Sequence, residues 1–382
     1  MLHQRIKNHP LKERGHQVRA NDLARKIRKL SGLYSNPIRC KGPELQIIVQ
    51  RQSCCIAIEI ETLMKFARTP YLATAIAALM LASPFAVQAL PNVGAIIKKI
   101  GMPNVGDVMS GPKPVSTNIK DAIYGDPSKD NFKPPVTVAS MMGLPRTDNG
   151  GFLLKSGYFE MINQSYCLHA GTYGPGGGDG YLYAPVKGSA QEAVTAILQN
   201  SVANPDIEQR NIQLLLWAIV SRSKFEDLNT ELKIVASRLL SKKQIASLNR
   251  NALSVLTSPQ LLRVTGGLPA PLRQVMQAEA DMRRMLSAPG LVYADMERAA
   301  VLAGKAPVGE GSVETPSRRW SKHPDGYYIR FIPSGYSHTL VQIWVEPGSV
   351  AIGRTYNPAT HVAVPGNTSR QRLAQSARVY GG

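Results

Sequence analysis

The hydrophobic pattern of this 382-residue chain changes period along its length. Two short runs between residues 158 and 169 are rich in aromatic and β-branched side chains, which predicts strands. Apolar residues then recur at helical spacing over about 190–303, with helix starts such as the Ser241 and Gln244 capping box. Over 326–345 two aromatic and β-branched runs flank a turn, which predicts a β-hairpin. We therefore expect an α+β protein: a small β part, a helical body and a C-terminal antiparallel β-hairpin unit.

One predicted helix is apolar around most of its circumference. Residues 212–220 contain leucine, isoleucine, valine and tryptophan on nearly every side, so this helix is expected at the centre of the core. Its start is predicted at Asn204, with Pro205 in the first helical position. The preceding helix is expected over 193–202, after a capping box that begins at Ser189.

The N-terminal part has the organisation of an exported protein. Residues 64–89 run from a short basic start through an apolar centre to small residues, which is typical of a signal peptide cut after Ala89. Residues 1–63 are then either a disordered arm or an upstream extension that results from a wrongly assigned start codon, with Met64 as the true start. The alternative is a cytoplasmic arm ahead of an uncleaved anchor. The remaining chain is divided into three parts. They are a linker or lead-in segment (90–150), a main α+β domain (151–305), and a small C-terminal β unit with a polar tail (306–382).

Charge narrows the expected partners. The chain carries a formal net charge of +19, part of it in residues 1–89. A basic exported chain suits contact with an anionic envelope surface. No nucleic-acid motif is present, and we expect no stable membrane span once the signal is cleaved. The predicted location is the periplasm, the cell surface or the medium.

Cysteine usage points to one residue. Cys40, Cys54 and Cys55 precede the expected cleavage point, which leaves Cys167 as the single cysteine of the mature chain. A lone cysteine in an exported protein forms no intramolecular disulfide and requires another explanation. Four roles are open: a buried inert thiol, an intermolecular disulfide, a catalytic nucleophile or a thioester.

The order of motifs around Cys167 supports the last role. Tyr166 and Cys167 are followed by a glycine-rich loop, a predicted helix, and then Gln213 and Trp217 four residues apart. This order resembles the bacterial surface thioester domains over about residues 155–225. In that family a cysteine after an aromatic residue is cross-linked to the glutamine of a Thr-Gln-x-x-x-Trp-like helix. The resemblance implies a bond between Cys167 and Gln213, an apolar wall of Tyr166 and Trp217, and attachment to an amine of a surface polymer or protein.

The chemistry implied is an acyl transfer. The Cys167 thiolate attacks the Gln213 carboxamide and expels ammonia, and a target amine later takes the acyl group. His169 lies two residues from Cys167, on the same face of a predicted strand, where it would take or deliver a proton. The chain departs from the family pattern at Ile212, where threonine is usual.

Two other classes remain open. Cys167 with a histidine would make a hydrolase or transferase of the envelope, although no family signature surrounds the histidines. A non-catalytic structural protein with a buried thiol is the other, and the aromatic residues of the hairpin would then form a core or a contact surface. We favour an exported binding protein over an enzyme. No cofactor is expected, and no paired Cys/His spacing predicts a metal site.

Overall fold

The longest strand, β3 (Gly157–Cys167), organises the sheet of this computed structural model, which describes residues 112–381. Alternate side chains of β3 are buried, as a strand with one face toward a core requires. β9 (His338–Val345) pairs antiparallel with β3 from Gly157 to Gln164. β12 (Leu373–Val379) pairs with the end of β3 on the other edge, where Leu373 lies opposite Cys167.

The sheet curls until its strands close a ring. β12 continues to β11 (His361–Pro365), β11 to β5 (Tyr181–Pro185), β5 to β8 (Tyr328–Ser334), and β8 returns to β9. All of these pairs are antiparallel. β1 (Val138–Ser140) adds in parallel to β3, and β7 (Ser321–Lys322) adds to β8. The result is barrel-like, with buried side chains of strands from before and after the helical segment in one interior.

Two small sheets tie loops to this ring. β2 (Phe152–Leu153) pairs with β10 (Thr355–Tyr356). β4 (Thr172–Tyr173) pairs in parallel with β6 (Val301–Leu302), which connects the glycine loop to the end of the helical segment.

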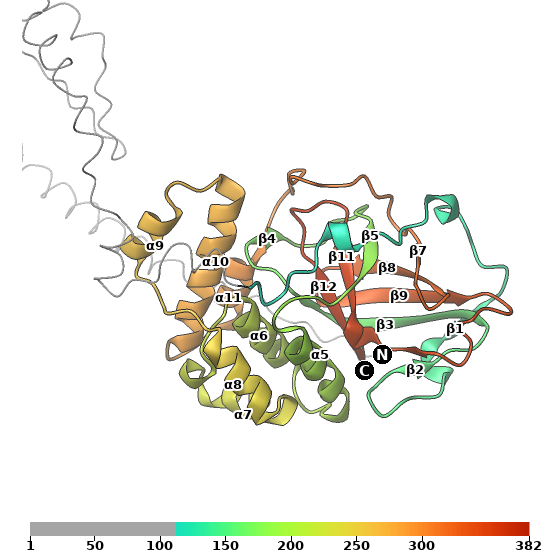
Figure 1. Ribbon diagram of the computed structural model, residues 1–382, viewed down its shortest axis with the longest axis horizontal. Helices are drawn as coiled ribbons and strands as arrows, with labels where there is room; N and C mark the ends of the chain where they lie inside the picture. The colour runs from blue at the N-terminus through green and yellow to red at the C-terminus, as the bar shows by residue number, and fades with distance from the viewer. Residues whose placement is uncertain (1–111, 382) are drawn as a thin grey trace, which may run out of the picture. The chain divides into compact units, whose positions relative to one another are not determined.

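The helical segment lies between β5 and β7 in the sequence and gathers at one side of the sheet (Figure 1). Its α-helices are α5 (Gln191–Asn200), α6 (Gln209–Val220), α7 (Thr230–Leu239), α8 (Lys242–Arg250), α9 (Ser258–Thr265), α10 (Ala270–Ser287) and α11 (Tyr293–Ala300). The short 3-10 helices are η2 (Ile119–Asp121), η3 (Pro127–Lys129), η4 (Met141–Gly143), η5 (Ser201–Ala203), η6 (Phe225–Asp227) and η7 (Pro358–Thr360).

Helix α6 is central, as its pattern predicts, with every residue from Ile212 to Val220 buried. The capping box of Ser241 and Gln244 on α8 is also confirmed. The predicted starts of α5 and α6 are wrong. The Ser189 hydroxyl donates to backbone carbonyls near residue 112 and makes no cap, and α6 begins at Gln209, after a turn that contains Pro205.

Mixed α and β structure is confirmed, but the expected layout needs correction. The hairpin of β8 and β9 does not form a separate unit, because β9 pairs with β3 and β8 with β5. The tail expected to be frayed contains β12, which lies between β3 and β11. Residues 112–381 belong to one compact unit. The expected extension, signal peptide and cleavage point lie outside the described residues.

Candidate functional site

Cys167 ends strand β3 at the point where the strand passes beneath the helices. The N–H of Leu168 donates to the Arg372 carbonyl at 3.0 Å, so Cys167, one residue earlier, directs its own N–H and carbonyl away from β12. β9 no longer covers that edge, because its pairing with β3 ends at Gln164. Two buried backbone groups of Cys167 therefore need a partner from outside the sheet.

Gln213 supplies that partner. The Cys167 N–H donates to Gln213 Oε1 at 2.8 Å, and Gln213 Nε2 donates to the Cys167 carbonyl at 3.1 Å. Cys167 is fully buried and Gln213 is 2% exposed. The structure thus brings the two residues of the predicted bond together, with the carboxamide against the main chain of the cysteine.

Gln209, one helical turn before Gln213, makes a similar contact. Its Nε2 donates to the Ser337 carbonyl at 2.6 Å and to the Ser165 carbonyl at 3.2 Å. Two carboxamides at positions i and i+4 of α6 therefore dock the helix on this edge of the sheet. Sequence reasoning missed Gln209, although the four-residue spacing from Gln213 is visible in the sequence.

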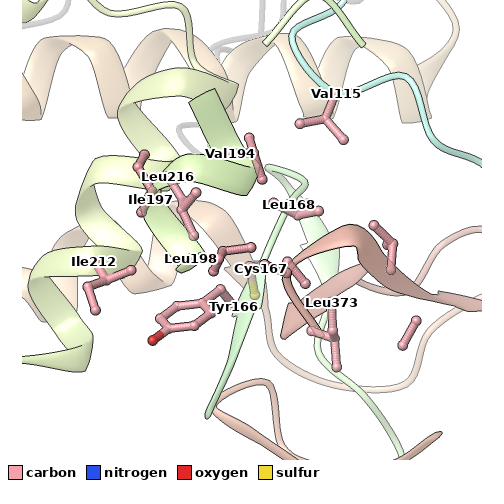
Figure 2. Close-up of a cluster of buried hydrophobic side chains, with 14 of the residues drawn as sticks. Val115, Tyr166, Cys167, Leu168, Val194, Ile197, Leu198, Ile212, Leu216 and Leu373 are labelled. Atoms are coloured by element: carbon pink, nitrogen blue, oxygen red, sulfur yellow. The ribbon is translucent and has the colours of Figure 1, made fainter. Parts of the chain in front are cut away.

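The thiol of Cys167 lies in a closely packed apolar environment. Figure 2 shows it between the strand that carries Leu373 and the helices that carry Leu198 and Leu216. Burial raises the pKa of the Cys167 thiol well above its ordinary value, and the negative charge of Glu297 raises it further. The thiol is therefore protonated at neutral pH, unlike the thiolate of a conventional cysteine nucleophile.

Trp217 and Tyr166 are both fully buried, but they differ in their surroundings. Trp217 packs its ring at 5.7 Å from the ring of Tyr293 and at 6.5 Å from that of Tyr336. The Tyr166 hydroxyl donates to Gln164 Oε1 at 2.9 Å, and its ring lies in the buried cluster beneath α5 and α6 (Figure 2). Because side chains alternate along a strand, Tyr166 projects from the face opposite to Cys167.

A pocket of 330 Å³ reaches Gln213 from the surface. Its lining comes from β3, the first turns of α6, the start of α11, the β8–β9 turn and the residue after β12: Ser165, Glu208, Gln209, Arg210, Gln213, Tyr293, Tyr336, Ser337 and Tyr380. A small nucleophile therefore has a route to the carboxamide, while the thiol stays covered.

A chain of hydroxyl groups borders this pocket. The hydroxyls of Tyr293 and Tyr336 are 3.1 Å apart, and the Tyr336 hydroxyl donates to Glu297 Oε1. Burial is the main reason that the pKa of Tyr293 is raised to about 12, and it also raises the pKa of Tyr336. Both phenols are therefore neutral at pH 7. The sequence indicated Tyr336 only as one of the hairpin aromatics, and gave no sign of Tyr293 or Glu297.

His169 does not have the predicted strand position. β3 ends at Cys167, so the alternation that would align the two side chains does not extend to residue 169. Burial lowers the pKa of His169 well below its ordinary value, with the positive charges of Arg372 and Lys113 adding to it. Among the described contacts, His169 makes no side-chain hydrogen bond to Cys167 or Gln213.

The structure also describes the hairpin aromatics and the glycine loop, and it can be searched for a metal site and a membrane span. Of the two roles left open for the hairpin aromatics, a core or a contact surface, the structure shows the core for Tyr327, Tyr328 and Trp344, which are buried. The glycine loop is held by Arg370, which pairs with Asp179 at 2.9 Å. Within residues 112–381, no group of three or more His, Cys, Asp or Glu side chains is arranged to hold a metal ion. No helix in that range has the length and hydropathy needed to cross a bilayer.

Comparisons with family models, curated proteins and solved structures found no match for this chain.

Proposed function

We propose that this protein attaches covalently to a target amine through an internal thioester between Cys167 Sγ and Gln213 Cδ. One observation carries the proposal. The Gln213 carboxamide is hydrogen bonded to both backbone groups of Cys167, at the inner end of a pocket that is open to the surface. A single cysteine and a single glutamine are thereby paired within a closely packed core.

The bond-forming step balances without a further reactant. Cys167 Sγ attacks Gln213 Cδ, the bond from Cδ to Nε2 breaks, and the thiol proton leaves with the nitrogen as ammonia. During attack, negative charge develops on Oε1, which already accepts a hydrogen bond from the Cys167 N–H. The buried surroundings then protect the thioester from hydrolysis.

The same contacts have a simpler interpretation, in which Gln213 only docks α6. Gln209 shows that a carboxamide of this helix serves that purpose without a cysteine. An envelope hydrolase or transferase is less well supported, because the Cys167 pKa is raised and no described histidine hydrogen bonds with the thiol. The alternative to the thioester is therefore a non-catalytic protein with a buried thiol.

Intact-mass measurement of the native protein separates these interpretations. A thioester lowers the mass by one ammonia, and methylamine converts it to an N-methylamide that is one methylene group heavier than the unmodified chain, while freeing the Cys167 thiol. Cys167→Ala and Gln213→Glu abolish the loss, because one lacks sulfur and the other lacks the leaving nitrogen.

Gln209→Ala is the matched control, since it removes a docking carboxamide from the same helix and leaves the reacting pair intact. It retains the loss of ammonia. A full unmodified mass and a thiol that titrates in the native protein would reject the thioester.

We also propose that the target is an amine on a surface polymer or protein, and that the protein acts in the periplasm, on the cell surface or in the medium. The signal-like order of residues 64–89 and the basic charge support this location. The same mass spectrum tests export by a cleaved signal peptide, because such a chain begins near Leu90 and an intact Met1 contradicts the cleavage.

A further inference from the structure

We infer that Tyr293, Tyr336 and Glu297 form a proton relay that takes the proton released when an amine attacks the Gln213 acyl carbon. The inference rests on the proposed thioester and assigns to it residues outside the Cys–Gln pair. It follows from the position of the three side chains, from the direction of their hydrogen bonds, and from the need to remove a proton from the attacking nitrogen.

The first step is position. Tyr293 and Tyr336 line the pocket that also reaches Gln213, and both rings pack against Trp217 on the same helix. An amine that approaches Gln213 through this pocket therefore passes the two tyrosines. Both tyrosines and Glu297 are only partly buried, so the relay lies between the closed core and the solvent.

The second step is direction. An ionised carboxylate only accepts hydrogen bonds, so Tyr336 donates to Glu297. The Tyr336 oxygen then accepts from the Tyr293 hydroxyl, 3.1 Å away. With both protons directed toward Glu297, the Tyr293 oxygen has free lone pairs that can accept a proton from an attacking nitrogen.

The third step is the proton balance. A neutral primary amine bonds to Gln213 Cδ, the bond from Cδ to Sγ breaks, and its electron pair goes to sulfur. One proton of the nitrogen passes through Tyr293 and Tyr336 to Glu297, which leaves sulfur as a thiolate. Glu297 then releases this proton to water and the thiolate takes one from water, so the carboxylate and the thiol are both restored. Protonation of Glu297 also removes the negative charge that opposes a thiolate at Cys167.

Tyr336→Phe tests the relay, because it removes one hydroxyl and keeps the ring against Trp217. Thioester content is measured first, as the mass lost, and aminolysis is then followed as the rate of methylamine incorporation. We expect full thioester content and a rate at pH 7 reduced at least about tenfold, within the range of general acid–base effects. Glu297→Gln, which keeps an acceptor and removes the base, gives the same result.

The control is Tyr158→Phe, which removes a partly buried tyrosine hydroxyl outside both the pocket and the relay, and leaves the rate unchanged. The pH profile supplies a second readout. The deficit of Tyr336→Phe shrinks as the pH rises toward 10, where hydroxide replaces the relay as the proton acceptor, whereas a structural defect persists.

The two proposals fail differently. A thioester that forms and reacts equally fast in wild-type protein, Tyr336→Phe and Glu297→Gln overturns the relay alone. Wild-type protein without the loss of ammonia overturns both.

Discussion

Gln213 is the residue on which both interpretations of the site depend. As a docking residue it satisfies two buried backbone groups of Cys167, and as a reactant it contributes the acyl carbon. Its neighbour Gln209 shares only the first task. The docking role can therefore be measured by itself, by changing each glutamine in a variant that lacks Cys167 and cannot form a thioester.

We expect docking to be energetically important even without the bond. In a Cys167→Ala background, Gln213→Ala leaves a buried N–H and carbonyl unpaired and lowers the free energy of unfolding by about 2–6 kcal/mol, since each unpaired group costs about 1–3 kcal/mol. Urea denaturation monitored by circular dichroism measures the change.

Gln209→Ala in the same background provides the comparison. It removes the hydrogen bonds of Gln209 Nε2 to two carbonyls at the pocket, where water can replace them. The free energy of unfolding therefore falls by less than it does in the Gln213 variant. Equal stability of the Gln213 variant and its parent would show that the carboxamide contributes nothing to docking.

Strand β12 completes the ring of strands. It lies between β3 and β11, and the Arg378 side chain donates to the Pro205 and Ile207 carbonyls just before α6. The strand thus closes the ring and also supports the turn that leads into the helix of Gln213.

Truncation at the C-terminus tests this role. A chain that ends at Arg372 lacks β12, exposes the edges of β3 and β11, and loses cooperative unfolding, which near-UV circular dichroism during thermal denaturation detects. A chain that ends at Val379 keeps the strand and unfolds cooperatively. Native-like unfolding of the shorter chain would contradict the assignment of β12 to the core.

At the scale of the whole molecule, a second cluster of titratable groups joins side chains of β5 and β11 to those of the β7–β8 turn. His323 Nε2 is 3.0 Å from the Tyr183 hydroxyl, and His361 Nε2 is 2.8 Å from the Tyr327 hydroxyl. The two imidazoles stack with their centroids 5.0 Å apart. Burial lowers the pKa of His323 to about 4, although Asp325 opposes the shift, and burial with the charge of His323 lowers that of His361 to about 3.

These shifts predict that the fold loses stability in mild acid. Between the unfolded pKa of about 6.5 and the lower folded values, the unfolded chain binds more protons, so stability falls as the pH falls. From pH 7 to pH 5 we expect a loss of up to about 2 kcal/mol for each histidine in urea denaturation.

His361→Gln should reduce this pH dependence, since the glutamine side chain does not titrate. His338→Gln is the control, because His338 is only partly buried and lies outside the cluster. A wild-type stability that is constant from pH 7 to pH 5 would contradict the prediction.

Several features of this protein follow from local sequence alone. The apolar surface of residues 212–220 predicts a central helix because no side of it tolerates water, and the Ser241 capping box predicts the start of α8 because its hydrogen bonds are local. The order of Tyr166, Cys167 and Gln213 predicts which pair to examine, and the structure brings Cys167 and Gln213 together.

Only the tertiary structure decides the rest, because it depends on contacts between distant segments. β12 lies in a polar stretch, and its strand pairing is set by the closing ring. The pocket joins α6, α11 and the β8–β9 turn, so the chain of Tyr293, Tyr336 and Glu297 has no signal in any single stretch. His169 lacks its predicted alignment for the same reason: β9 pairs with β3 only as far as Gln164 and β12 as far as Cys167, where the strand ends, and local propensity does not determine these partners.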